Sequence, residues 1–239
     1  MKSEDRKYKV ELKDLGFCDF KDAWDIQISY FDKLISWKKS VNYGGSSKKE
    51  PPSGTLIFVE HPHVYTLGKS GLENNMLIDA IQMRAKGASF YRIDRGGDIT
   101  YHGPGQIVCY PIFDLEAVNV GLKEYIYKLE ETIIKVVEEY GLKASRLESG
   151  TGVWLDPEVN GKARKICAIG VKASRFVTMH GLAFNVNTNL EYFNFINPCG
   201  FTDKGVTSIE KELGRKQELD EVKKIICEKL KEVFSLEIF

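Results

Sequence analysis

The sequence predicts an α+β fold, and three observations lead to this prediction. Short runs rich in β-branched and aromatic residues recur in both halves of the chain. Three longer segments carry apolar residues at every third or fourth position, as amphipathic helices do. These helices do not alternate regularly with the strands, which argues against a β-α-β arrangement. A length of 239 residues fits a single domain, so we expect residues 1–239 to fold as one unit.

The first predicted helix covers residues 19–39, with Asp19 as its N-cap. Its apolar positions recur with a period close to that of an α-helix: Phe20, Trp24, Ile28, Phe31 and Ile35. The second helix covers residues 122–140, with Gly141 as the expected C′ residue, and the third covers about 219–234. The stretch 36–54 mixes glycine, serine, lysine and a proline pair, so it predicts an exposed loop inserted in the domain.

The strand-like runs fall into two groups, one before and one after the second helix. In the first half they cover residues 55–60, 64–67, 89–94 and 106–115. In the second half they cover residues 144–149, 152–156, 165–174 and 181–188. Strand runs followed by isolated helices are the pattern of an α+β domain.

Composition excludes several classes of protein. Lys and Arg (34) balance Asp and Glu (34), so a protein that mainly binds nucleic-acid backbone is not expected. A hydrophobic content of 43% excludes a disordered chain, and no apolar run is long enough to span a membrane. The charged N-terminal segment is not a secretion signal, so we expect a cytoplasmic protein. Five widely spaced cysteines indicate free thiols and no metal site.

The densest unusual segment is Arg95–Gln106, which holds four glycines in twelve residues. Glycines let backbone N–H groups approach a ligand closely, while Arg95, Thr100, His102 and Gln106 supply polar side chains. The segment lacks the lysine and hydroxyl ending of a P-loop and the spacing of a dinucleotide-binding turn. From the pattern alone, it is either a ligand-binding loop or a glycine-rich hairpin connection.

A candidate nucleophile, Cys199, lies between Pro198 and Gly200, which favours a sharply shaped turn. A thiol becomes an effective nucleophile at neutral pH when a nearby cation lowers its pKa from about 8.5. Lys165, at the start of a predicted strand, and His102 are the two candidates for that cation. A lone cysteine is also often a packed apolar residue, and a lone lysine is often a surface residue.

The run 180–187 alternates apolar and polar residues, which predicts a half-buried strand. Its small residues Gly181 and Ala183 leave space either for a narrow hydrocarbon chain or for close packing of a neighbouring strand. His61 and His63, on a proline turn, are too poorly partnered to predict a metal site, and we assign them no role.

Five strings together resemble the cytosolic lipoyl(octanoyl) transferases. They are HPHVYTLG (61–68), RGGDITYHGPGQ (95–106), KICAIGV (165–171), HGLAFNVN (180–187) and INPCG (196–200). They occur in the family's order and cover most of residues 55–210, which makes the combination highly specific. The N-terminal helix and the last 30 residues carry little of this signal.

The resemblance implies a fold and a reaction. The fold is the mixed β-sheet flanked by helices of lipoate- and biotin-protein ligases, here a single catalytic domain over residues 1–239. The reaction moves an octanoyl group to a lysine through a thioester on the catalytic cysteine, Cys199, with Lys165 as the catalytic lysine. No cofactor or metal is implied, because a thioester donor is already activated.

The resemblance also places the acyl-binding residues on three segments of the chain. These residues are Arg95, Gly96, Gly97, Asp98, Ile99, Thr100, Tyr101 and His102, then Ala168, Ile169 and Gly170, and finally Gly181, Leu182 and Ala183.

The implied donor is octanoyl-acyl carrier protein, and the implied acceptors are the lipoyl domains of 2-oxoacid dehydrogenase E2 subunits and the glycine cleavage H protein. We expect a monomer that binds neither nucleic acid nor membranes. Two alternatives stay open, an ATP-dependent lipoate or biotin ligase and an acyl-carrier-binding protein without catalytic activity. A group of basic residues near Lys165 further predicts a docking surface for an acidic carrier: Lys162, Arg164, Lys172 and Arg175.

Overall fold

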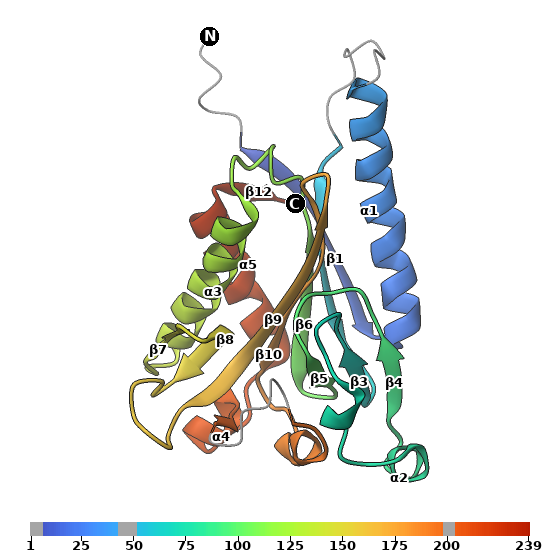
Figure 1. Cartoon of the computed structure of the whole chain (residues 1–239). Helices are drawn as coiled ribbons and strands as arrows, with labels where there is room; N and C mark the ends of the chain where they lie inside the picture. The colour runs from blue at the N-terminus through green and yellow to red at the C-terminus, as the bar shows by residue number, and fades with distance from the viewer. Residues whose placement is uncertain (1–6, 43–51, 198–203) are drawn as a thin grey trace.

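A large and a small β-sheet form the framework of the protein (Figure 1). The computed structural model describes residues 7–42, 52–197 and 204–239. Within them, nine strands form the large sheet: β1 (Tyr8–Phe17), β2 (Gly54–Glu60), β6 (Gln106–Ile112), β7 (Ala144–Leu147), β8 (Gly150–Leu155), β9 (Arg164–Ser174), β10 (Val177–Asn185), β11 (Gly205–Val206) and β12 (Leu236–Ile238). The small sheet holds β3 (Val64–Leu67), β4 (Ser89–Arg92) and β5 (Ile99–His102).

Both sheets mix parallel and antiparallel pairs, which confirms the predicted fold class. The large sheet has the order β12-β1-β2-β6-β10-β9-β8-β7, with β11 beside β9. Its centre is antiparallel, whereas the β1–β2, β1–β12 and β9–β11 pairs are parallel. In the small sheet β3 lies between β4, which is parallel to it, and β5, which is antiparallel.

Helices cover both faces of the large sheet (Figure 1). On one face, α3 (Leu122–Glu139) and α5 (Leu219–Phe234) pack over a core that includes Leu129, Ile133 and Phe184. On the other face, α1 (Phe20–Asn42) packs over Val108, Met179 and Ala183. The shorter helical segments are α2 (Ala80–Ala85), α4 (Ile209–Leu213), η2 (Glu73–Asn75) and η3 (Leu190–Phe195). In the described part of the chain, no helix is both long and apolar enough to cross a membrane.

Coverage on both faces corrects one sequence expectation. The run 180–187 was expected to be a half-buried strand, but every residue of β10 is buried. The neighbouring strand β6 is buried along its whole length as well. A central strand with elements packed on both sides has no solvent face, so polar residues such as His180 and Asn185 are held inside by hydrogen bonds.

The end of α1 corrects a second expectation. Residues 36–42 belong to the helix, not to an exposed loop, and residues 43–51 lie outside the described part of the chain. Lys38 is buried three residues after Ile35, so its amine occupies the inner face of the helix. Its Nζ lies 2.5 Å from Asp114 Oδ1 and 2.5 Å from Glu116 Oε2. The lysines of this stretch indicated solvent exposure, but Lys38 is neutralised by two carboxylates beneath the helix.

The junction between the two sheets contains two buried histidines, and burial keeps both neutral. His61 Nδ1–H donates to the Cys18 carbonyl (2.8 Å), so its Nε2 accepts from the Tyr110 hydroxyl (2.9 Å). The ring of His102 lies 6.0 Å from that of His61. Burial lowers the pKa of His61 to about 4 and that of His102 to about 3. His61 therefore has a structural role that the sequence did not reveal.

Substituting Lys38 with Met should lower the free energy of unfolding by about 3 kcal/mol, because Asp114 would then be a buried carboxylate without its cation. Urea denaturation measures the change. Lys39→Met, one position along on the exposed side of the same helix, should change it by less than about 0.5 kcal/mol. Equal effects of the two substitutions would contradict the role of the buried ion pair.

Acid should destabilise the protein before its carboxylates titrate. The unfolded chain protonates His61 and His102 near pH 6.5, whereas the folded chain resists protonation down to about pH 4 and 3. Stability is therefore complete above pH 6.5 and falls by roughly 1.5 kcal/mol per histidine between pH 6.5 and 5. In His61→Gln this loss should shrink by that amount, as measured by urea unfolding at both pH values. An unchanged pH slope in the variant would exclude this explanation.

Candidate functional site

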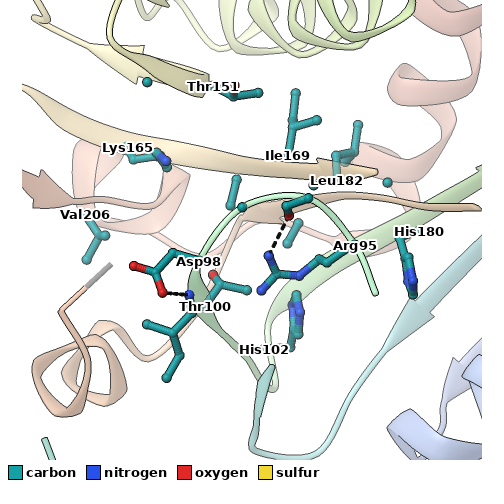
Figure 2. A pocket seen from close by; sticks show the side chains of 18 of the residues that line it. Arg95, Asp98, Thr100, His102, Thr151, Lys165, Ile169, His180, Leu182 and Val206 are labelled. Carbon is teal, nitrogen blue, oxygen red and sulfur yellow. Dashed lines mark hydrogen bonds between the residues drawn. The ribbon is translucent and has the colours of Figure 1, made fainter. Parts of the chain in front are cut away.

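A cavity of about 750 Å³ opens beside the central strands of the large sheet (Figure 2). The loop between β4 and β5 lies along it, and the start of α3 and β8 contribute exposed residues such as Leu122 and Thr151. Other lining residues are buried, among them Phe20, Ile93, Val108 and Tyr110. Its volume is typical of a small-molecule site, and its lining is mainly apolar with a few polar groups.

All three predicted acyl-binding segments meet at this cavity. The lining includes residues 95–100, His102, 168–170 and 181–183. Tyr101 is the exception, because its side chain packs into the core of the small sheet with Tyr65 and Leu67. Its buried ring packs on Tyr192, and its hydroxyl shares a 2.7 Å hydrogen bond with His63 Nδ1. Tyr101 therefore supports the small sheet from behind the cavity.

The register of three strands makes a narrow apolar floor. Ala168 on β9 pairs with Ala183 on β10, and Ala183 pairs with Val108 on β6. All three line the cavity, so one row of small side chains crosses three neighbouring strands. Residues in such a row share one face of the sheet.

Gly181, beside this row, allows a neighbouring strand to pack closely. A Cβ at Gly181 would lie 2.2 Å from the Cys109 carbonyl oxygen and 2.6 Å from Pro111 Cδ. The missing side chain therefore allows close packing against β6, which was one of the two sequence interpretations. Pro111 brings no N–H to the β-ladder, and Thr178 donates its hydroxyl to the Pro111 carbonyl (2.9 Å). Opposite this proline, β10 is distorted and His180 has a φ of 61°.

The distortion places His180 beside the segment that begins at Asp94. His180 Nε2 lies 3.1 Å from Asp94 Oδ1, and Lys172 Nζ lies 2.6 Å from Asp94 Oδ2. The hydrogen bond from His180 and the Lys172 ammonium hold the pKa of Asp94 well below its ordinary value. Gly96 N–H donates to the Val171 carbonyl (2.9 Å), so two bonds from side chains and one from the backbone fix the glycine-rich loop to β9 and β10.

Arg95 connects this loop to the small sheet from within the cavity wall (Figure 2). It is 8% exposed, and its Nη2 donates to the carbonyl (2.7 Å) and the hydroxyl (3.0 Å) of Thr66. Nη1 donates to the Gly96 carbonyl (3.0 Å). A guanidinium with several donors in one plane suits this bridging position.

A chain of hydrogen bonds assigns the tautomer of His102. Gln106 Nε2 donates to the Tyr101 carbonyl and to Asn185 Oδ1, so Gln106 Oε1 accepts from His102 Nδ1–H (2.9 Å). The unprotonated His102 Nε2 then faces the Thr66 hydroxyl at 3.3 Å. Asn185 Nδ2 continues the chain to the Thr207 carbonyl (3.0 Å). With a pKa of about 3, His102 is neutral at physiological pH, which makes it unsuitable as the cation beside a thiolate.

Lys165 stands at the other side of the cavity, near the start of β9 (Figure 2). Its Nζ lies 4.6 Å from the centre of the Trp154 ring, which supports the ammonium through a cation–π contact. Gly152 has a φ of 118°, and a Cβ there would lie 2.5 Å from the Cys167 carbonyl oxygen and 3.5 Å from Lys165 Cε. Only glycine suits this position, and it leaves room beside the lysine stem.

Cys199 falls outside the described residues, but the residues on either side of the gap line the cavity. They are Asn197 and Lys204. Asn197 N–H donates to the Asn75 carbonyl (2.8 Å), and after the gap Val206 pairs with Lys165. The chain after the gap therefore lies beside Lys165, and the chain before it is held by the segment that follows β3.

The four described cysteines are poor nucleophiles. Cys109 and Cys167 are buried, Cys18 and Cys227 are half-buried, and burial raises the pKa of all four thiols. Within the described ranges, no group of His, Cys, Asp and Glu could hold a metal ion.

Two of the four basic residues expected to form a docking surface are engaged in ion pairs. Arg164 is paired with Asp156 and Glu212, and Lys172 is paired with Asp94. Arg164 and Lys172 are eight positions apart on β9, which corresponds to about 26 Å of strand. The charges of these two residues are partnered within the chain, and the docking surface stays a prediction.

Comparison with known proteins identifies the family. The model of the lipoyl protein ligase A/B catalytic domain matches residues 43–231. An octanoyltransferase of Parabacteroides distasonis is 55% identical over 222 residues, which cover 93% of this chain and 97% of the relative. An octanoyltransferase of Bacteroides fragilis is 54% identical over 215 residues, which cover 90% of this chain and 93% of the relative.

A solved structure of similar fold is a bipartite lipoate protein ligase from Thermoplasma acidophilum. It matches with a TM-score of 0.69 and 14% identity, over 97% of this chain and 86% of the other. The fold is thus shared with a ligase, while the close sequence relatives are transferases. The chain therefore belongs to the octanoyltransferases of the lipoyl protein ligase A/B catalytic-domain family.

Proposed function

We propose that this octanoyltransferase moves its acyl group from octanoyl-acyl carrier protein to a lipoyl-domain lysine through a thioester on Cys199. The observation that carries the proposal is the shared cavity. Lys165, the acyl-binding segments and the residues flanking Cys199 all line it. Cys199 follows Asn197 by two residues, and two residues of extended chain span about 7 Å. Because Asn197 and Lys165 line the same cavity, this short separation in sequence supports a joint role of Cys199 and Lys165.

The first half of the proposed reaction acylates the enzyme. The Lys165 ammonium stabilises the Cys199 thiolate, which attacks the carbonyl carbon of the donor thioester. The new carbon–sulfur bond forms as the bond to the carrier's thiol breaks. The leaving thiolate takes a proton from Lys165, which is then a neutral amine.

The second half transfers the octanoyl group. Neutral Lys165 takes a proton from the acceptor ammonium, whose pKa is about 10.4 in water. The free amine attacks the thioester, Cys199 leaves as a thiolate, and the amide nitrogen releases its second proton to solvent. This returns Lys165 and Cys199 to their starting charges. Because the donor thioester already holds the activated acyl group, no ATP is needed.

The proposed acceptors are the lipoyl domains of 2-oxoacid dehydrogenase E2 subunits and the glycine cleavage H protein. The Thermoplasma lipoate protein ligase of similar fold is described together with its E2 lipoyl domain, which supports this class of acceptor. We further expect the enzyme to act as a monomer in the cytoplasm. The alternative, an ATP-dependent ligase, is suggested by the same fold and would work without Cys199.

Replacing Cys199 with Ser should abolish the octanoyl adduct and lower kcat/KM by at least about 1,000-fold, because serine is not ionised near neutral pH. Intact-mass spectrometry after mixing with octanoyl-acyl carrier protein detects the adduct. Cys227→Ser, at a half-buried thiol on α5, is the matched control and should keep both adduct and rate. Transfer from octanoic acid and ATP by Cys199→Ser would instead select the ligase reaction.

Replacing Lys165 with Ala should slow adduct formation by about 100-fold at pH 7. Without the ammonium, the thiol pKa returns toward about 8.5, so the variant's rate should rise about tenfold per pH unit up to that value. Rapid-quench mass spectrometry from pH 6.5 to 9.5 measures this profile. Lys143→Ala, at an exposed lysine that does not line the cavity, should match the unmodified enzyme. If the rate of Lys165→Ala depends on pH in the same way as that of the unmodified enzyme, Lys165 does not stabilise the Cys199 thiolate.

A further inference from the structure

Phe20, the first residue of α1, closes the buried end of the cavity. It lines the cavity and is 3% exposed. It lies before residue 43, where the match to the family model begins, and outside all five strings of the sequence resemblance. The first turn of α1 approaches the small sheet beside β4 (Figure 1). We propose that Phe20 sets the upper limit of acyl chain length, an inference that rests on the proposed octanoyl transfer.

The direction of the cavity floor leads from Lys165 to Phe20. The row Ala168–Ala183–Val108 crosses from β9 to β6, and Val108 pairs with Val59 on β2. His61 follows β2, and its ring lies 5.4 Å from that of Phe20. Three strand spacings separate β9 from β2, which is about 14 Å. The seven carbon–carbon bonds of an octanoyl chain extend no further than roughly 11 Å. An octanoyl chain therefore fills most of this path, and a dodecanoyl chain, about 5 Å longer, exceeds it and meets the Phe20 ring.

The Phe20 ring is held in place by aromatic neighbours on several sides. The ring centres of Trp24, Tyr91 and His102 lie 6.0, 5.2 and 6.2 Å away. The His102 ring is nearly parallel to it, with an interplanar angle of 8°. A ring enclosed in this way has no space for a second rotamer, so it acts as a fixed wall.

The end of the path is apolar although polar residues border it. Both ring nitrogens of His102 are taken by Gln106 and Thr66, and the Tyr110 hydroxyl is bonded to His61. Ile93, 6% exposed, completes the wall with an aliphatic side chain. A terminal methyl group fits such a surface. A carboxylate at the end of the chain would find no free hydrogen-bond donor among these residues.

The test is the chain-length profile of transfer. Octanoyl, decanoyl and dodecanoyl groups on acyl carrier protein are compared by kcat/KM with Phe20→Leu and Phe20→Ala. Opening the wall should raise the ratio of dodecanoyl to octanoyl transfer about tenfold or more, since each methylene that finds apolar space contributes about that much discrimination. Ile93→Ala enlarges the same end from the β4–β5 connection and should shift the profile in the same direction. This variant tests the same end of the cavity even if a Phe20 variant folds poorly.

Phe31→Leu is the matched control. Phe31 is buried on the same helix but does not line the cavity. Its substitution should therefore lower the stability of the protein without changing the chain-length profile. If the unmodified enzyme transfers octanoyl groups but the ratio of long-chain to octanoyl transfer is unchanged in both the Phe20 and Ile93 variants, the inference about Phe20 is wrong. The proposed function would then still hold. Absence of any octanoyl transfer by the unmodified enzyme would instead overturn the proposed function.

Discussion

The antiparallel register of β6, β10 and β9 is the constraint on which the site depends. It aligns Ala168, Ala183 and Val108 across three strands and leaves Lys165 at one end of the row. Because side chains alternate along a strand, a slip of one residue would turn this row to the opposite face of the sheet. Burial on both faces makes such a slip costly, since Asn185 and His180 would lose their hydrogen-bond partners.

Polar groups fix this register from both sides. Gln106 and Asn185 are paired across β6 and β10, and their side chains also bond to each other at 2.9 Å. Further along the same strands, Asp94 pairs with His180 on β10 and with Lys172 on β9. The buried polar network thus surrounds an apolar floor instead of interrupting it. Because each of these contacts joins residues far apart in sequence, the site forms only with the complete sheet.

The relation between fold and reaction is also instructive. The Thermoplasma ligase shares the fold at 14% identity, whereas the Bacteroides and Parabacteroides octanoyltransferases share more than half of their aligned residues. A common framework can hold an acyl chain in both kinds of enzyme, while the activating chemistry depends on a few side chains. In this chain the proposed candidates for that chemistry are Cys199 and Lys165.

The sequence by itself determined the local elements and the candidate chemistry. Periodicity identified α3 and α5 nearly to the residue, and the strand-like runs coincide with β2, β3, β6, β8 and β9 to within about three residues. The motif segments around Arg95, Ala168 and Ala183 do line one cavity. These features follow from spacing along the chain, which a single sequence contains.

Tertiary structure decided what spacing does not encode. The strand β1, its pairing with β12 and the strand β5 inside the glycine-rich segment were not predicted, because their partners are distant in the chain. Lys38 and His61 were read as surface or unassigned residues until their buried partners were known. Tyr101 turned away from the cavity, and Phe20 entered it from a helix with little family signal. The physical reason is common to all of them, since partners brought together by folding, not neighbours in sequence, decide where a side chain is buried and what it contacts.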